Sequence, residues 1–449
     1  MKEMKNPGAP RFTKGRQIFM AKDTNIALRN QVLYSVFVRD HTEEGTFAAL
    51  EKDLDRIRAL GTDIIWLMPI HPIGREARKG KDGSPYAIRD YRDVNPEYGT
   101  REEFCHLVDA IHARGMKCII DVVYNHTSPD SWLKEHHPEW FFHKPDGSFG
   151  NQVADWGDII DLDYKNNPDL WDYQIDTLKM WASIVDGFRC DVAPLVPVEF
   201  WERARAEVET VRPGCIWLAE SVDPPFIKEN RDHGVYAASD CEVYRAFDME
   251  YDYDMKEYYL GYIKKTIPLS RYVEMLLHQE MIYPQNYVKM RHLENHDNPR
   301  ARDLIPEIPQ LQNWTAFMYF LRGSLLLYGG QEKAVAHLPD LFNVDVVPWN
   351  GEDTVDLTGL LQSLYPIKHD PILADGVVEM KAYDEEDTAV IVYRKDGRTC
   401  VGVFSLMAKN ADVPVPAPDG TYQNRIDGSD VVVKDGKLLG SGRPVIFDC

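Results

Sequence analysis

The amino-acid sequence predicts an α/β fold: a (β/α)8 TIM barrel with a short insertion after its third strand and an all-β C-terminal domain. Three observations support this prediction. Strand and helix patterns alternate through the first 124 residues, the alternation stops near His126 and resumes near Leu170, and beyond Leu373 only short strand patterns occur. Such alternation is typical of parallel strands joined by crossover helices.

The first elements are defined by apolar strand runs and by helical spacing. The first helix carries Leu50, Leu54 and Ile57 on one face and closes on Gly61. The second strand stops at Pro69, which cannot continue a sheet ladder. The order is therefore strand, helix, strand, helix, strand, at residues 31–40, 47–60, 63–69, 101–114 and 117–124.

The following segment, residues 126–169, is rich in Trp, Phe, Gly, Asp and Pro and has no clear period. It is too long for an ordinary loop, which predicts a small inserted subdomain. An eighth strand is expected near 244–247, in a Tyr- and Asp-rich stretch. Helix and strand patterns otherwise alternate again after the insertion, at 170–182, 185–191, 198–211, 215–220, 269–279, 287–294, 310–321 and 324–328.

The C-terminal part reads as a β-sandwich, because its short strands are separated by Asp-Gly, Pro and Asn turns. These strands are expected at 377–382, 389–394, 400–406 and 445–447. We therefore divide the chain into a first barrel part (1–125), an insertion (126–169), a second barrel part (170–373) and a C-terminal β-sandwich domain (374–449).

Charge and composition limit the partners that this chain can have. The net charge of −21 disfavours phosphate backbones and anionic membranes, so we expect neither nucleic-acid nor membrane binding. Ten Trp and 23 Tyr residues offer flat surfaces on which ligand rings can stack. The sequence leaves the oligomeric state open.

The cysteine pattern and the N-terminus predict a cytoplasmic protein. The seven cysteines form no CxxC motif, which argues against a disulfide framework or a zinc site. Residues 1–20 are polar and basic and contain no apolar core of a signal peptide. A secreted protein whose signal had been removed would look the same.

Polar residues follow four of the predicted strands, at the ends that meet at one mouth of a parallel barrel. The four stretches are DVVYNH (121–126), GFRCD (187–191), WLAES (217–221) and ENHDNPR (294–300). They bring together the carboxylates Asp191, Glu220 and Asp297. Carboxylates are seldom buried without a task, so this clustering predicts an active site.

These four stretches resemble, in order and spacing, the four signature regions of the α-amylase family of glycoside hydrolases. Flanking segments agree: MPI (68–70), SPYAIRDY (84–91), NPEYG (95–99) and GGQE (329–332). The resemblance extends from about residue 30 to residue 335. It implies a barrel, an insertion equivalent to the family's domain B, a tail equivalent to its domain C, and a retaining reaction on α-glucans.

The resemblance also implies the catalytic roles. Asp191 is expected to be the nucleophile and Glu220 the acid/base of a pair that retaining enzymes hold about 5–5.5 Å apart. Asp297 is expected to bind sugar hydroxyls and to favour the distorted, positively charged transition state. We expect Arg189 to keep Asp191 ionised by lowering its pKa, and Trp217 and its neighbours to give Glu220 a less polar pocket.

Five further residues are predicted to bind the sugar. By resemblance, Tyr86 stacks on the sugar face, and His126 and His296 donate hydrogen bonds to its hydroxyls. Arg189 is counted among the sugar-binding residues because it lies on the same strand face as Asp191. Arg300 is expected to help hold Asp297.

A calcium ion bridges the barrel and domain B in many members of the family, with oxygen ligands. Asn125 and Asp161 match two of the usual ligands. The alternative is that both residues are simply hydrogen-bonded or solvated, with no ion.

The sequence departs from the family pattern after the expected nucleophile. Many starch-cleaving members carry a Lys-His pair there, whereas this chain has Val-Ala-Pro-Leu at 192–195. A long groove on the leaving-group side is therefore not expected, and short maltooligosaccharides are favoured. The segment IIDLDY (159–164) lacks the variants of neopullulanases and oligo-1,6-glucosidases, so the bond specificity stays open between α-1,4 and α-1,6, with α-1,4 favoured.

The sequence thus predicts an α-amylase-like retaining hydrolase that cleaves α-1,4 bonds of starch-derived glucans or maltooligosaccharides. A 4-α-glucanotransferase or an α-glucosidase would use the same carboxylates. A sugar-binding relative without catalysis is a third possibility, against which the presence of both Asp191 and Glu220 argues.

Overall fold

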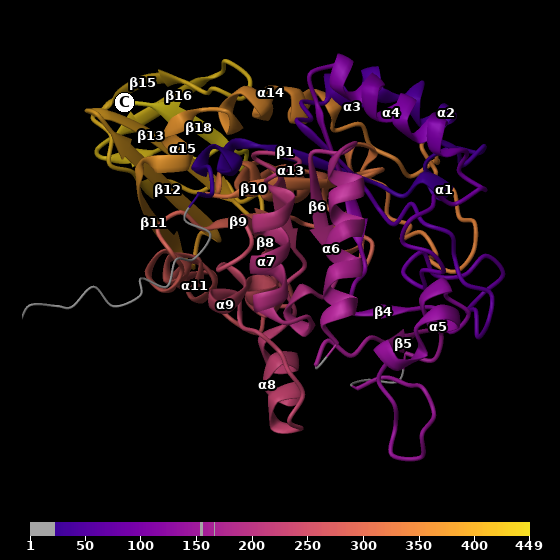
Figure 1. The fold of residues 1–449 in the computed structure, drawn as a ribbon. Coiled ribbons are helices and arrows are strands. Elements are labelled where there is room, and N and C mark those ends of the chain that lie inside the picture. The colour runs from indigo at the N-terminus through magenta and orange to yellow at the C-terminus, as the bar shows by residue number, and fades with distance from the viewer. Residues whose placement is uncertain (1–22, 153–155, 166) are drawn as a thin grey trace, which may run out of the picture.

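The computed structural model describes residues 23–152, 156–165 and 167–449. Within them, eight parallel strands close into a barrel in the order β1-β10-β9-β8-β7-β6-β3-β2, which confirms the predicted fold class (Figure 1). Residues 1–20, which suggested that no export signal is present, lie outside the described residues. The strands are β1 (Val32–Val36), β2 (Ile64–Leu67), β3 (Lys117–Val122), β6 (Gly187–Cys190), β7 (Ile216–Ala219), β8 (Met249–Tyr251), β9 (Val288–Arg291) and β10 (Ser324–Tyr328).

One barrel strand lies a few residues from its predicted place. The expected strand at 244–247 follows the short helix α9 (Asp240–Val243), and β8 begins only at Met249. Tyr244 and Phe247 are fully buried side chains outside the strand. The apolar character of this segment comes from helix packing, which is why it resembled a strand.

Helices surround the barrel. The helix expected at 47–60 is divided into α2 (Phe47–Glu51) and α3 (Leu54–Ala59). The other long helices are α4 (Arg101–Ala113), α6 (Pro168–Ala182), α7 (Val198–Val208), α11 (Leu269–Ile282), α13 (Ile308–Phe320) and α14 (Thr358–Lys368). Shorter ones are α1 (Val38–His41), α5 (Trp132–His136), α8 (Pro224–Asp232), α10 (Lys256–Ile263), α12 (Ala301–Leu304) and α15 (Pro371–Asp375).

The insertion after β3 folds around a two-stranded antiparallel ribbon. Its strands are β4 (His126–Thr127) and β5 (Ile160–Asp161), and His126 pairs with Asp161. The ribbon starts shortly after the carboxyl end of β3, so it anchors the insertion beside the barrel mouth. Figure 1 shows the insertion extending from that end of the barrel, with α5 next to β5.

The C-terminal domain is a sandwich of two four-stranded antiparallel sheets. Valines from both sheets, such as Val390 and Val433, form its core. The alternate residues of β12, such as Ile391 and Tyr393, belong to the barrel core instead, as the period of two in a strand requires. The sheets are β11 (Val377–Tyr383), β12 (Thr388–Lys395), β13 (Arg398–Ser405) and β18 (Val445–Asp448), and β14 (Val413–Pro414), β17 (Lys437–Leu438), β16 (Asp430–Lys434) and β15 (Gly420–Gln423).

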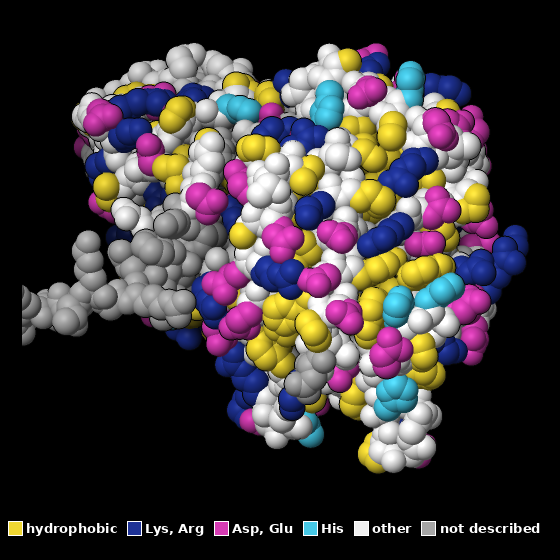
Figure 2. Space-filling model, in the orientation of Figure 1, with side chains coloured by type: hydrophobic (Ala, Val, Ile, Leu, Met, Phe, Trp, Pro, Cys, Tyr) yellow, Lys and Arg dark blue, Asp and Glu magenta, His cyan; other side chains and the backbone are white. Residues whose placement is uncertain are grey.

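The surface mixes both signs of charge despite the net charge of −21. Figure 2 shows Lys and Arg side chains interspersed with Asp and Glu. Arg203 of α7, for example, lies 2.5 Å from Asp172 of α6 and 3.0 Å from Glu207. Within the described residues, no helix is both long enough and apolar enough to cross a bilayer.

Candidate active site

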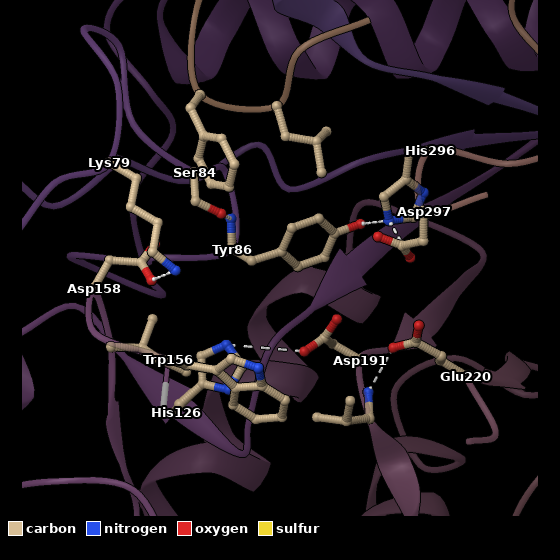
Figure 3. Close-up of a pocket in the computed structure, with 14 residues that line it drawn as sticks. Lys79, Ser84, Tyr86, His126, Trp156, Asp158, Asp191, Glu220, His296 and Asp297 are labelled. Carbon is tan, nitrogen blue, oxygen red and sulfur yellow. Dashed lines mark hydrogen bonds and ion pairs between the residues drawn. The ribbon is translucent and has the colours of Figure 1, made fainter. Parts of the chain in front are cut away.

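A cavity of about 280 Å³ opens at the carboxyl ends of the barrel strands (Figure 3). Register between neighbouring strands brings polar groups together beneath it, because Asp121 of β3 lies beside Arg189 of β6. The cavity is lined by Lys79, Ser84, Tyr86, His126, Trp156, Asp158, Ile159, Asp191, Val192, Glu220, His296, Asp297, Leu341 and Phe342.

Arg189 is fully buried beneath the cavity and binds three carboxyl groups. Its Nη1 donates hydrogen bonds of 2.9 Å to both Asp121 Oδ1 and Asp191 Oδ1. Its Nη2 forms an ion pair of 3.0 Å with Glu220 Oε2. One planar cation therefore holds the two expected catalytic carboxyl groups next to each other.

The two carboxyl groups differ in proton affinity. Burial raises the pKa of Asp191 to about 6, although Arg189 opposes the shift. Burial raises the pKa of Glu220 further, to about 8, again against Arg189 and with help from the charge of Asp191. Arg189 lowers the pKa of Asp191 as predicted, but burial has the larger effect, so the pKa of Asp191 still lies above its usual value.

The backbone after β6 adds a hydrogen bond to Glu220. The amide of Val192 donates to Glu220 Oε2 at 2.8 Å. Val192 has a φ of 33°, a left-handed conformation that is costly for a β-branched residue. Such strain persists only where the surrounding structure enforces it. Here the left-handed conformation directs the Val192 amide toward the Glu220 carboxyl group.

Tyr86, His296 and Asp297 form a second connected group. The Tyr86 hydroxyl donates to Asp121 Oδ2 at 3.1 Å and lies 2.7 Å from His296 Nε2, with the two rings stacked at 5.3 Å. His296 Nε2 is 3.0 Å from Asp297 Oδ2. Burial would raise the pKa of Asp297, but the charge of His296 lowers it to about 2, so Asp297 stays ionised at the cavity.

His126 completes the opposite wall. Its Nε2 lies 3.9 Å from Asp191 Oδ2, and its ring contacts Trp156 of the insertion at 6.0 Å. Burial lowers the pKa of His126 to about 4, so the ring is neutral near neutral pH. A neutral imidazole can both donate and accept, which suits contact with sugar hydroxyls.

Two arginines lie elsewhere than the sequence suggested. Arg300 is fully buried; it donates to Glu294 Oε1 at 2.6 Å and to the carbonyl oxygens of His337 and Gly329. It does not hold Asp297, because its donors are engaged by these partners. Arg189 lies below the carboxyl groups, and neither arginine is among the side chains that line the cavity, so their predicted contact with a sugar stays a prediction.

Sequence reasoning missed other residues that line the cavity or lie buried beneath it. Asp121 accepts hydrogen bonds from Arg189 and from Tyr86. Its position in the DVVYNH stretch is the sequence feature that could have identified it. Lys79 and Asp158 form an ion pair of 2.7 Å at one end of the cavity. Phe342 comes from the loop after β10. Nothing in the local pattern links these last three residues, since they lie in separate irregular segments.

The two expected calcium ligands are both hydrogen-bonded within the protein, and calcium binding stays a prediction. Asp161 accepts hydrogen bonds from Asn151 Nδ2 at 3.2 Å and from the Gln152 amide at 2.6 Å. The Nδ2 atom of Asn125 is 3.2 Å from His126 Nδ1. Among the described residues, no group of three or more His, Cys, Asp or Glu side chains is arranged to hold a metal ion.

Comparisons with known proteins match both the barrel and the C-terminal domain of this chain. The family profile described as "Alpha amylase, catalytic domain" matches residues 19–372, and "Bacterial Alpha amylase C-terminal domain" matches residues 379–447. An α-amylase structure from Lactobacillus plantarum is 46% identical, with a TM-score of 0.92, and the alignment covers 95% of this chain and 100% of that one. The maltogenic α-amylase AmyB from Thermotoga neapolitana is 32% identical, with a TM-score of 0.83 and coverage of 94% and 99%.

A curated relative is an α-1,4-glucan:maltose-1-phosphate maltosyltransferase from Pseudomonas aeruginosa, 35% identical over 217 residues. That alignment covers 43% of this chain and 32% of the relative, so the match spans about a third of the larger protein. The family profile, by contrast, covers the whole barrel and its insertion. The barrel, the carboxyl-lined cavity at its mouth and these matches together show that this chain belongs to the α-amylase family of enzymes.

Proposed function

We propose that this enzyme is a retaining glycoside hydrolase that cleaves α-1,4-glucosidic bonds in maltooligosaccharides or starch-derived glucans. The observation that carries the proposal is the pair Asp191 and Glu220, held by one guanidinium but with pKa values of about 6 and about 8. Near neutral pH the first is ionised and the second is protonated. Retaining glycosidases need these two states in adjacent carboxyl groups.

In the first step, Asp191 attacks the anomeric carbon while Glu220 gives its proton to the leaving oxygen. A covalent glycosyl-enzyme forms and the shortened glucan leaves. In the second step, Glu220 takes a proton from water, whose oxygen displaces Asp191 from the anomeric carbon. Two inversions give net retention, and Glu220 ends protonated as it began.

The surrounding residues act on the positive charge that develops on the sugar. Asp297 stays ionised through His296 and attracts that charge more strongly in the transition state than in the ground state. Tyr86 offers an aromatic face, and the neutral His126 offers a hydroxyl partner on the opposite wall. Together these groups favour a pyranose with several hydroxyls.

Transfer of the glycosyl group to a second sugar is an alternative that one observation favours. The curated relatives with matching segments are named maltosyltransferases. The same two carboxyl groups serve both reactions, since only the acceptor that attacks the glycosyl-enzyme differs.

The test is incubation with maltoheptaose and, separately, with pullulan, followed by chromatography of the products and NMR of their anomeric form. Shorter products in the α-anomer, absent with D191N, support the retaining hydrolase. Products longer than the substrate support transfer, and products in the β-anomer contradict the retaining mechanism. No turnover of either glucan contradicts the proposed substrate class.

A further inference from the structure

Lys79 and Asp158 join two separate segments across one end of the cavity. Lys79 lies between β2 and α4, and Asp158 lies in the insertion. Lys79 Nζ is 2.7 Å from Asp158 Oδ1. Figure 3 shows the pair at the end of the cavity opposite Glu220, with Tyr86 and Asp191 between them.

Hydrogen bonds to the loop after β10 fix the segment that carries Lys79. The carbonyl oxygen of Phe342 accepts hydrogen bonds of 3.0 Å from the amides of Asp82 and Gly83. Buried Arg39 donates to the carbonyl oxygens of Gly83 at 3.0 Å and of Leu341 at 2.7 Å. The loops after β2 and β10 therefore form one wall, and Lys79 reaches from it to the insertion.

The ion pair is more enclosed than an ordinary surface pair. The Asp158 side chain is only 7% exposed, although Lys79 is 44% exposed. Nζ of Lys79 also lies 5.8 Å from the centre of the Phe342 ring, a cation–π contact that further limits its positions. Partial burial shields the pair from solvent, so it holds its geometry better than an exposed pair would.

The position of Glu220 defines the orientation in which a glucan binds in the cavity. Glu220 protonates the leaving oxygen, so the part of the glucan that leaves lies on the side of Glu220. The part that stays bound extends the other way, toward the non-reducing end of the chain. A glucan that continued past the bound sugar in this direction would meet Lys79 and Asp158.

We propose that the Lys79–Asp158 ion pair closes the non-reducing side of the site and restricts the enzyme to the non-reducing ends of α-glucan chains. The proposal rests on the proposed function and adds an exo mode of attack to it. The ammonium and carboxylate groups bind hydroxyls of the terminal sugar, and a chain extended or blocked at that end is excluded by contact with the pair.

The experiment compares two p-nitrophenyl maltoheptaosides, one with free non-reducing hydroxyls and one with its terminal 4- and 6-hydroxyls joined in an ethylidene acetal. Products are followed by chromatography. The wild-type enzyme is expected to cleave the blocked substrate at least about tenfold more slowly than the free one. In K79A and D158A, the cleavage rate of the blocked substrate divided by that of the free substrate is expected to rise about tenfold.

Two further variants make the result specific. The exchanged pair K79D/D158K, which restores opposite charges, is expected to bring the ratio back toward the wild-type value. The control is K333A, which removes the surface ion pair of 2.9 Å between Lys333 and Asp356, and it is expected to leave the ratio unchanged.

Three outcomes of this experiment would contradict different parts of the proposal. Equal cleavage of both substrates by the wild-type enzyme overturns the exo proposal and leaves the hydrolase intact. An unchanged ratio in both K79A and D158A shows that the pair is not the barrier. Failure to cleave even the free substrate contradicts the proposed function itself.

Discussion

Nη2 of Arg189 lies 3.0 Å from Oε2 of Glu220, although Arg189 stands on β6 and Glu220 directly follows the neighbouring strand β7. The same guanidinium binds Asp191, which directly follows β6, at 2.9 Å. One buried cation therefore fixes the relative position of both carboxyl groups. Because it stabilises the ionised form of each, it also keeps both pKa values lower than burial alone would allow.

The pH dependence of kcat/KM is expected to be bell-shaped. Activity requires ionised Asp191 and protonated Glu220, so it rises as pH rises through about 6 and falls as pH rises through about 8. The two limbs belong to the interacting pair. The measurement is kcat/KM for maltoheptaose between pH 4 and pH 10, and a profile without the basic limb would argue against Glu220 as the acid.

Replacing Glu220 by Gln is expected to lower kcat on maltoheptaose by about 10²- to 10⁴-fold, the usual contribution of a general acid. α-Glucosyl fluoride, whose leaving group needs no proton, is expected to react with E220Q to form the glycosyl-enzyme. The matched variant D191N is expected to be inactive on both substrates. Mass spectrometry of the trapped intermediate distinguishes the two roles, and labelling of D191N would contradict them.

Replacing Arg189 by Met is expected to move both limbs of the pH profile to higher pH. Arg189 lowers the pKa of Asp191 and of Glu220, so its removal raises both values. Leaving buried carboxylates without their partner is also expected to cost about 3–5 kcal/mol in the free energy of unfolding. Urea unfolding and the pH profile measure these effects. R189K keeps the charge and should shift the limbs less; equal shifts would exclude a charge effect.

Replacing Arg300 by Met is expected to affect stability more than substrate binding. Arg300 neutralises buried Glu294, so the loss of this pair is expected to cost about 3–5 kcal/mol. Urea unfolding measures this loss, and KM for maltoheptaose measured below the transition is expected to stay close to that of the wild type. A raised KM with unchanged stability would return Arg300 to the substrate-binding group.

Much of the fold could be predicted because it depends on local patterns. Apolar runs and helical spacing identified seven barrel strands closely, and the alternation predicted that they are parallel. The eighth strand was predicted at 244–247, a few residues before its actual position, because Tyr244 and Phe247 are buried without belonging to a strand. Burial from helix packing and burial in a sheet leave the same apolar residues in so short a segment.

The clustering of Asp191, Glu220 and Asp297 also followed from the sequence. Once strands are parallel and closed into a barrel, residues at their carboxyl ends must meet at one mouth. The sequence by itself therefore determined the fold class, the family resemblance and that Asp191, Glu220 and Asp297 lie at one cavity.

Only the tertiary structure decided how these groups are paired. In the structure, Arg189 forms ion pairs with three carboxyl groups and Arg300 forms one with Glu294. Lys79 forms an ion pair with Asp158 at one end of the cavity. The physical reason is that burial and partner choice depend on distant segments packed together. The pKa of Asp191 shows this most clearly, since the sequence revealed its neighbouring arginine but not the larger effect of burial.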